Sequence, residues 1–253
     1  MRDMKKLSFL ICLVLIVSIL APIASIASAG KPNGAPPTLE KRVFIHYKRG
    51  YGRGPPPGGG SQPKEKGHSD HYELLGKGVK WRETPVSYII DPDNPDGLPE
   101  GFIVAAITAS AEEWDRYTSV DLFGAYSVDY SASWDDDAPD GANELVFGDY
   151  PREGVIAITI VWGYFSGPPG LREIVEFDVM FDTDYAWGDA AALGGAVMDL
   201  QDIATHELGH GAGLGDLYYC ELETMYGYAF YGETMKRDLY AGDIAGIQYL
   251  YGK

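Results

Sequence analysis

The segment from His206 to Asp216 carries the residue types that hydrolytic metal centres use. It reads His-Glu-Leu-Gly-His-Gly-Ala-Gly-Leu-Gly-Asp. In a helix, residues four apart lie one turn apart on the same face, so the imidazoles of His206 and His210 can reach one zinc ion. The glycines that follow tolerate positive φ and allow a sharp turn. We expect this turn to bring Asp216 back as a third ligand.

Glu207 follows the first of these ligands and has the chemistry of a general base. Three protein ligands leave one coordination position open, which is typical of a catalytic zinc site. The Glu207 carboxylate can hold a metal-bound water there, accept its proton and pass it to a leaving amine, so the predicted reaction is hydrolysis. The alternative is a helix with two surface histidines and a carboxylate, but composition predicts His-Glu-x-x-His only about 0.006 times in such a chain. The other histidines are His46, His68 and His71, all before or at the edge of the acidic body.

The pattern His-Glu-x-x-His-x-x-Gly-x-x-Asp, with a methionine after it, resembles that of the metzincin metallopeptidases. The resemblance is closest to the matrixin branch and covers roughly residues 70–253. The segments that carry it are a methionine turn at Glu223–Tyr228, a strand at Asp178–Asp182 followed by Trp187, and a last helix within Leu239–Gly252.

This resemblance implies a fold and a set of site residues. The fold is α+β: a twisted, mostly parallel mixed sheet with one antiparallel edge strand, an active-site helix and a C-terminal helix. His206, His210 and Asp216 would bind zinc, Glu207 would be the catalytic acid and base, and Met225 would form the floor under the metal.

The sequence also departs from the matrixin pattern. Matrixins usually have histidine at the position of Asp216, and a carboxylate there cancels one zinc charge, so the bound water would be less acidic. The cysteine of the matrixin prosegment is absent, which excludes a cysteine switch. The histidines of the matrixin structural zinc are absent as well, so we expect no second zinc.

The elements that must position these residues follow from hydrophobic patterning. An apolar stripe predicts a helix over Glu100–Tyr117 with Trp114 in the core, and Asp199 is a candidate cap for a helix through His210. A last helix fits Asp243–Tyr251. Runs rich in β-branched and aromatic residues predict strands at Val79–Asp91, Val120–Tyr130, Glu144–Phe147, Val155–Phe165 and Ile174–Phe181. The resemblance suggests that Ile174–Phe181 is the edge strand that pairs with an extended substrate.

Residues 1–29 are predicted to be a secretory signal peptide. A basic start precedes the apolar run Leu7–Ile23, and Ala27-Ser28-Ala29 offers small residues for cleavage. The alternative is a membrane anchor, because the run approaches the length that spans a bilayer.

Removal of the signal leaves Cys220 as the single cysteine, so no internal disulfide is expected. We assign Cys220 to packing rather than to redox or metal chemistry.

Residues 30–69 are predicted to be a basic, Gly/Pro-rich leader or prosegment. Residues 30–82 carry a net charge of +7 and residues 83–253 carry −26, which together with the first 29 residues gives −17. The leader is either a solvated linker or a segment that folds back on the acidic body and covers its cleft until it is removed. As a further hypothesis, Asp70 or His71 plugs the open zinc position in a latent form.

Two acidic segments could bind calcium through oxygen ligands. The first contains Asp135–Asp137 and Asp140-Gly141-x-Asn143, and the second contains Asp182 and Asp184. The simpler interpretation, which we favour, is that these residues form turns.

Together these features predict a secreted zinc metalloendopeptidase with one catalytic domain at residues 70–253. Its substrates would be proteins or peptides, and it would be an extracellular monomer without stable membrane association after signal cleavage. The strong negative charge argues against nucleic-acid binding. One alternative is a zinc amidase that acts on another substrate such as peptidoglycan. Another is a non-catalytic, acidic metal-binding module, although such a module would have no need of Glu207.

Overall fold

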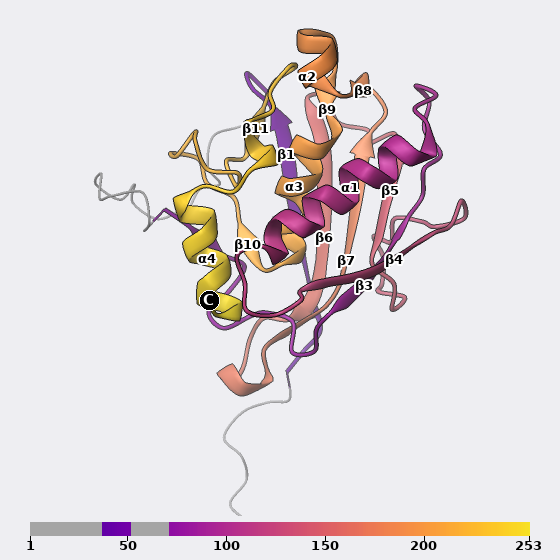
Figure 1. The fold of residues 1–253 in the computed structure, drawn as a ribbon. Coiled ribbons are helices and arrows are strands. Elements are labelled where there is room, and N and C mark those ends of the chain that lie inside the picture. Colours follow the sequence, from indigo (N-terminus) through magenta and orange to yellow (C-terminus); the bar gives the residue numbers. More distant parts are fainter. Residues whose placement is uncertain (1–36, 52–70) are drawn as a thin grey trace, which may run out of the picture. The chain divides into compact units, whose positions relative to one another are not determined.

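The computed structural model describes residues 37–51 and 71–253 (Figure 1). The predicted signal peptide and most of the predicted leader lie outside these residues. In the described ranges, no helix has the length and apolar character needed to cross a membrane.

A seven-stranded mixed sheet forms the framework, with the strand order β11-β1-β6-β7-β5-β3-β4. The strands β4, β3, β5 and β7 run parallel to one another. Strand β6 is antiparallel to both of its neighbours, and β1 is parallel to β11. The bounds are β1 Glu40–Lys48, β3 Val86–Ile90, β4 Phe123–Val128, β5 Glu144–Gly148, β6 Val155–Tyr164, β7 Glu173–Asp182 and β11 Tyr228–Ala229.

Helices and short strand pairs complete the fold. The helices are α1 Glu100–Asp115, α2 Ala190–Leu193, α3 Leu200–Gly211 and α4 Ala241–Tyr251, with short 3-10 turns η2 Pro169–Leu171, η3 Gly194–Ala196 and η4 Met235–Arg237. Strand β2 Glu73–Leu74 pairs with β10 Leu214–Gly215, and β8 Trp187–Gly188 pairs with β9 Met198–Asp199. The predicted α+β class, with a mixed sheet, an active-site helix and a C-terminal helix, is confirmed.

The predicted edge role of Ile174–Phe181 is wrong. This segment forms β7, which lies between β6 and β5 and pairs with both of them. Strand β6 is the antiparallel strand next to the parallel part of the sheet, and β1 covers its outer side. Strands β6 and β7 are both long and apolar. Composition alone does not distinguish a strand that is paired on both sides from a strand at the edge of the sheet.

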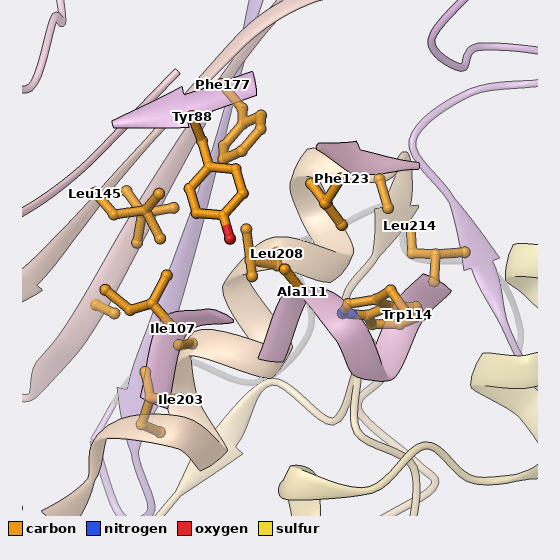
Figure 2. Packing of buried hydrophobic residues seen from close by; sticks show 14 of the residues in the cluster. Tyr88, Ile107, Ala111, Trp114, Phe123, Leu145, Phe177, Ile203, Leu208 and Leu214 are labelled. Carbon is orange, nitrogen blue, oxygen red and sulfur yellow. The ribbon is translucent and has the colours of Figure 1, made fainter. Parts of the chain in front are cut away.

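Helices α1 and α3 pack against one face of the sheet and against each other. The apolar stripe of α1 is buried, and its Trp114 is fully enclosed, as predicted. The indole nitrogen of Trp114 donates a hydrogen bond to the carbonyl of Thr205 in α3 over 2.8 Å. Figure 2 shows Trp114 with Ile107 and Ala111 of α1 near Ile203 and Leu208 of α3. This buried contact fixes the position of α3, which carries the His-Glu-x-x-His motif.

The two ends of α3 are set by specific residues. At its start, the side chain of Asp199 accepts a hydrogen bond from the backbone of Asp202 over 2.9 Å, as predicted for a helix cap. Past its end, Gly213 has φ of +105°, a conformation that residues with a side chain rarely adopt. The chain therefore reverses directly into β10 and returns toward the helix.

A glycine in α3 allows a close approach between three elements. A Cβ atom at position 209 would lie 2.3 Å from Met225 Sδ and 2.6 Å from Trp114 Cζ2. Position 101 in α1 is different, because a Cβ atom there would meet nothing within 4 Å.

We predict opposite effects of alanine at these two glycines. Gly209→Ala should lower the free energy of unfolding by about 1–3 kcal/mol because it overpacks a closed site. Gly101→Ala should raise it by up to about 1 kcal/mol because it reduces the freedom of the unfolded chain. Urea unfolding of the metal-free protein measures both values. Equal stability of the two variants would contradict the packing argument.

Candidate metal centre and active site

Three ligand atoms from α3 and the turn after it converge on one point. The Nε2 atoms of His206 and His210 lie 3.1 Å apart. Asp216 Oδ1 lies 3.3 Å from the first and 3.5 Å from the second. Zinc bonds of the usual length at tetrahedral angles place ligand atoms about 3.3–3.6 Å apart. The predicted ligands His206, His210 and Asp216 are thus brought together with a donor set and spacing that fit zinc.

The other ring nitrogen of each histidine is bound to a backbone carbonyl. His206 Nδ1 is 2.8 Å from the carbonyl oxygen of Thr224, and His210 Nδ1 is 3.0 Å from that of Leu214. A carbonyl oxygen only accepts, so each Nδ1 carries the hydrogen and each Nε2 presents a lone pair. Burial lowers the pKa of His206 to about 4, which keeps this ring neutral as metal binding requires.

The methionine turn is held by the C-terminal helix. Met225 is buried, with its sulfur directed at Gly209 of α3. The carboxylate of Asp243 in α4 accepts hydrogen bonds from the backbone of Thr224 over 2.7 Å and of Met225 over 3.1 Å. Because the carbonyl of Thr224 orients His206, Asp243 acts on this ligand through the turn.

Tyr218 contacts Asp216, the third predicted ligand, and no sequence motif singles Tyr218 out. Its hydroxyl donates to Asp216 Oδ2 over 3.0 Å, while its ring packs edge-on against Tyr228. Burial disfavours ionisation of Asp216, but His210 and His206 outweigh this effect and hold its pKa well below the usual range. The Tyr218 hydrogen bond leaves Oδ1 as the oxygen directed at the histidines.

Glu207 is fully buried beside these ligands. Thr159 of β6 donates its hydroxyl hydrogen to Glu207 Oε2 over 2.5 Å, a contact that sequence spacing could not reveal. Burial raises the pKa of Glu207 to about 7, against the lowering effects of His210 and of the Thr159 hydrogen bond. A carboxyl group with a pKa near neutrality can both take up and release a proton in one reaction.

Comparison with known proteins agrees with this geometry. Residues 164–252 match the family model of the matrixin peptidases. Human matrix metalloproteinase-19 is 27% identical over 186 residues, which cover 72% of this chain and 32% of the relative. Rat matrilysin is 38% identical over 192 residues, covering 72% of this chain and 62% of the relative. This chain is thus similar to the matrixins, and the family model matches its C-terminal part. It spans about a third of the human relative and less than two thirds of the rat one.

In this matrixin-like structure, a strand of the predicted leader lies over the two predicted ligand histidines. Phe44 of β1 stacks on His210 with 4.0 Å between ring centroids, and His46 lies over His206 at 3.9 Å. His46 Nδ1 is 3.1 Å from Glu207 Oε1. Burial, together with His206, Lys236 and His210, lowers the pKa of His46 well below its ordinary value. In the sequence His46 belongs to the predicted leader, and nothing in its spacing indicates this contact.

The hypothesis that His71 plugs the zinc position is wrong, and Asp70 lies outside the described residues. The structure places His71 beside Cys220, with Nδ1 2.5 Å from Sγ, and edge-on to Tyr219. Cys220 itself is half-buried against the core, and burial raises the pKa of its thiol to about 11. These contacts agree with a packing role for Cys220.

The two acidic segments form turns, and each of them also belongs to a group of three closely spaced carboxylates. Asp140 accepts a hydrogen bond from the backbone of Ala142, and the side chain of Asn143 bridges Ser87 and Phe177, as expected of turn residues. Carboxylate oxygens of Asp135, Asp140 and Glu144 nevertheless lie within 4.8 Å of one another, as do those of Asp149, Asp182 and Asp184.

We predict that Tyr218→Phe weakens zinc binding by about tenfold or more, because the carboxylate of Asp216 loses the hydrogen bond that orients it. Tyr226→Phe is the matched control, since Tyr226 lies in the same loop and contacts Tyr228 through its ring. Competition with a chromogenic chelator measures both affinities. Equal zinc affinity of Tyr218→Phe and the wild type would show that Asp216 needs no such support.

Proposed function

We propose that this chain is a secreted zinc-dependent metalloendopeptidase that hydrolyses peptide bonds in proteins. The supporting observation is the convergence of three ligand atoms spaced for zinc, with the buried Glu207 carboxyl beside them. His206, His210 and Asp216 would bind the metal, Glu207 would be the general base and acid, and Met225 would support the site from below.

Zinc, when bound, supplies a Lewis acid that polarises the scissile carbonyl and acidifies water. Glu207 takes a proton from the water as its oxygen attacks the carbonyl carbon. It then delivers this proton to the amine nitrogen as the C–N bond breaks, which leaves a carboxyl and an amine product. Thr159 holds Glu207 Oε2, which leaves Oε1, the oxygen next to His46 in this structure, as the one that would carry the proton.

An extended substrate would bind along the outer edge of β6. This edge replaces Ile174–Phe181, where the sequence predicts substrate binding. Strand β6 carries Thr159, which contacts Glu207, so a peptide paired with β6 passes the general base. In the structure this edge is paired with β1.

The division into a signal peptide at 1–29, a leader at 30–69 and a catalytic domain at 70–253 remains a proposal. It is supported by the basic start, the apolar run and the small residues before Gly30, together with the change of charge after the leader. The resulting protein would be extracellular and monomeric.

We predict that Glu207→Ala retains zinc but loses hydrolysis. The wild type and Glu207→Ala are both produced as residues 30–253 with a specific protease site inserted after Ser61. Each protein is assayed on casein before and after cleavage at that site. Each should hold about one zinc, and the mutation should lower the rate about 10²–10⁴-fold because the proton carrier is gone.

Other outcomes would contradict this function. Zinc in both proteins without hydrolysis in any form would favour a metal-binding module. Hydrolysis of peptidoglycan but not of casein would favour an amidase. Absence of zinc from both would overturn the ligand assignment.

We also propose that the carboxylate group of Asp149, Asp182 and Asp184 binds calcium. All its donors are oxygens, which calcium prefers, and the buried Oδ2 of Asp182 has no hydrogen-bond partner among the described residues.

Millimolar calcium should therefore raise the melting temperature of the zinc-loaded protein by several degrees, since a ligand bound only to the native state stabilises it. The double variant Asp182→Asn/Asp184→Asn should lose this increase, whereas the exposed control Asp93→Asn should keep it. An unchanged melting temperature in calcium would leave these residues as turn formers only.

A further inference from the structure

The ammonium group of Lys48, near the end of β1, lies among aromatic rings instead of beside a carboxylate. Its Nζ is 5.1 Å from the ring centroid of Tyr231, 6.0 Å from that of Tyr185 and 5.8 Å from that of Tyr51. Among the described residues Lys48 forms no ion pair, although the body around it is strongly acidic. A cation this close to a ring is attracted by the negative face of the ring.

Two of these rings belong to the acidic body, and the third belongs to the same segment as Lys48. Tyr185 is buried in the turn between β7 and β8, and Tyr231 follows β11 and is half-buried. Their ring centroids are 5.9 Å apart, with 48° between the planes. Tyr51 is three residues from Lys48 and would move with it. Tyr185 and Tyr231 therefore form a tyrosine pair that the body presents by itself.

The charges around the tyrosine pair favour a cation. Burial, together with the negative charges of Asp182 and Asp184, raises the pKa of Tyr185 to about 12. The phenol is therefore neutral at neutral pH, and its ring offers a face rather than an anion. The same two carboxylates attract a positive charge at this place. A lysine or arginine side chain meets both conditions, whereas an uncharged chain of equal length does not.

The backbone of Lys48 is bound in the way proposed for an extended substrate. Its N–H donates to the carbonyl of Gly154 over 2.8 Å, and it pairs in parallel register with Ala229 of β11. The register between β1 and β6 shifts between His46 and Tyr47, and such a bulge changes the direction of the side chains that follow. A peptide that binds β6 and β11 in the same direction would bring one of its side chains to the tyrosine pair.

The general base indicates how far this place lies from the bond to be cleaved. His46 Nδ1 is 3.1 Å from Glu207 Oε1, so the peptide bonds on either side of His46 are the nearest counterparts of a cleaved bond. Lys48 is two residues further along the chain. A substrate residue in its position would be the second or third residue after the cleaved bond.

We propose that Tyr185 and Tyr231 form a specificity subsite for a lysine or arginine side chain at the second or third residue after the cleaved bond. This proposal rests on the proposed peptidase function and on substrate binding along β6. The two ring faces bind the cation, while β11 aligns the backbone of the same residue. The preferred substrates are therefore extended segments with a basic residue shortly after the cleaved bond.

The test lets paired peptides compete in one reaction. Each pair shares a sequence that the enzyme cleaves in casein and differs at one position, which holds either lysine or norleucine. Norleucine keeps the four-carbon chain and lacks the ammonium group. The enzyme is zinc-loaded residues 30–253, cleaved at the protease site after Ser61. Both peptides compete for the same free enzyme, so any β1 that stays bound lowers both rates equally and leaves their ratio unchanged.

The varied position is moved through the four residues on each side of the cleaved bond. Calcium is held constant, because Asp182 belongs to the proposed calcium site beside Tyr185. Tyr231 is the residue to change, since Tyr185 is part of the buried core. Tyr231→Leu removes one ring face, and Tyr231→Phe keeps it. Phe230→Leu is the matched control, because Phe230 is an exposed aromatic residue in the same loop.

We expect the wild type to cleave the lysine peptide about threefold to tenfold faster than its norleucine partner, at the second or third residue after the bond and at no other position. This preference should fall below about twofold in Tyr231→Leu, because only one ring of the body then faces the cation. It should persist in Tyr231→Phe and in Phe230→Leu. Competitive binding of the same pairs to cleaved, zinc-loaded Glu207→Ala should show the same ratio without hydrolysis.

The subsite and the peptidase function fail in different ways. Equal cleavage of both peptides at every position would overturn the subsite and leave the peptidase function standing. A lysine preference that Tyr231→Leu retains would also overturn it, because the acidic body rather than the rings would then select the cation. If no peptide is cleaved, the peptidase function fails, and the binding ratio alone decides whether the tyrosine pair selects lysine. Absence of both hydrolysis and binding would overturn both proposals.

Discussion

The site depends on one constraint: two imidazoles and two carboxylates are buried together, so each of their polar atoms needs a partner. Most of them have one. Carbonyls of Thr224 and Leu214 take the Nδ1 hydrogens, and Tyr218 and Thr159 donate to one oxygen of each carboxylate. The Nε2 atoms of His206 and His210 and Asp216 Oδ1 remain, and all three are acceptors that face one another. A bound cation satisfies all three without leaving buried lone pairs in contact. Without a metal, a proton on His210 can take this role, because Asp216 outweighs the effect of burial and raises the pKa of His210.

The supports of this arrangement come from distant parts of the chain. Two successive hydrogen bonds connect α4 to α3. The backbone of Thr224 donates to the carboxylate of Asp243 in α4, and its carbonyl accepts from His206 in α3. Gly209 lets α3 approach both the methionine turn and Trp114 of α1. The helices therefore hold the ligands through backbone contacts, which vary less with side-chain motion than contacts between long side chains do. This explains why a catalytic centre can be built on one helix and a glycine-rich turn.

The parts of the site that are local in sequence were predictable, and the parts that depend on sheet register were not. The ligand spacing follows from one helical turn and one reversal, so His206, Glu207, His210 and Asp216 could be named as candidates from the chain alone. Thr159 and His46 reach Glu207 only because β6 and β1 lie in one particular register, with Phe44 opposite Thr159. The edge role given to Ile174–Phe181 failed for a related reason, because the outer strands come from segments far apart in sequence. Tyr218 lies near the motif, but its contact with Asp216 depends on how the turn folds.

The carboxylate ligand and the covering strand are physically compatible. A zinc ion with three histidines would leave two positive charges in the site, partly balanced by Glu207. With Asp216 as a ligand, one zinc ion and the carboxylates of Asp216 and Glu207 sum to zero charge, and neutral His206, His210 and His46 leave that sum unchanged. Burial of a neutral group of charges costs much less than burial of an unbalanced ion. In this structure Phe44 and His46 of β1 cover the site, so a neutral centre with Asp216 fits this buried place better than a charged centre with a third histidine. The departure from the usual matrixin ligand is thus consistent with the burial of the site under β1.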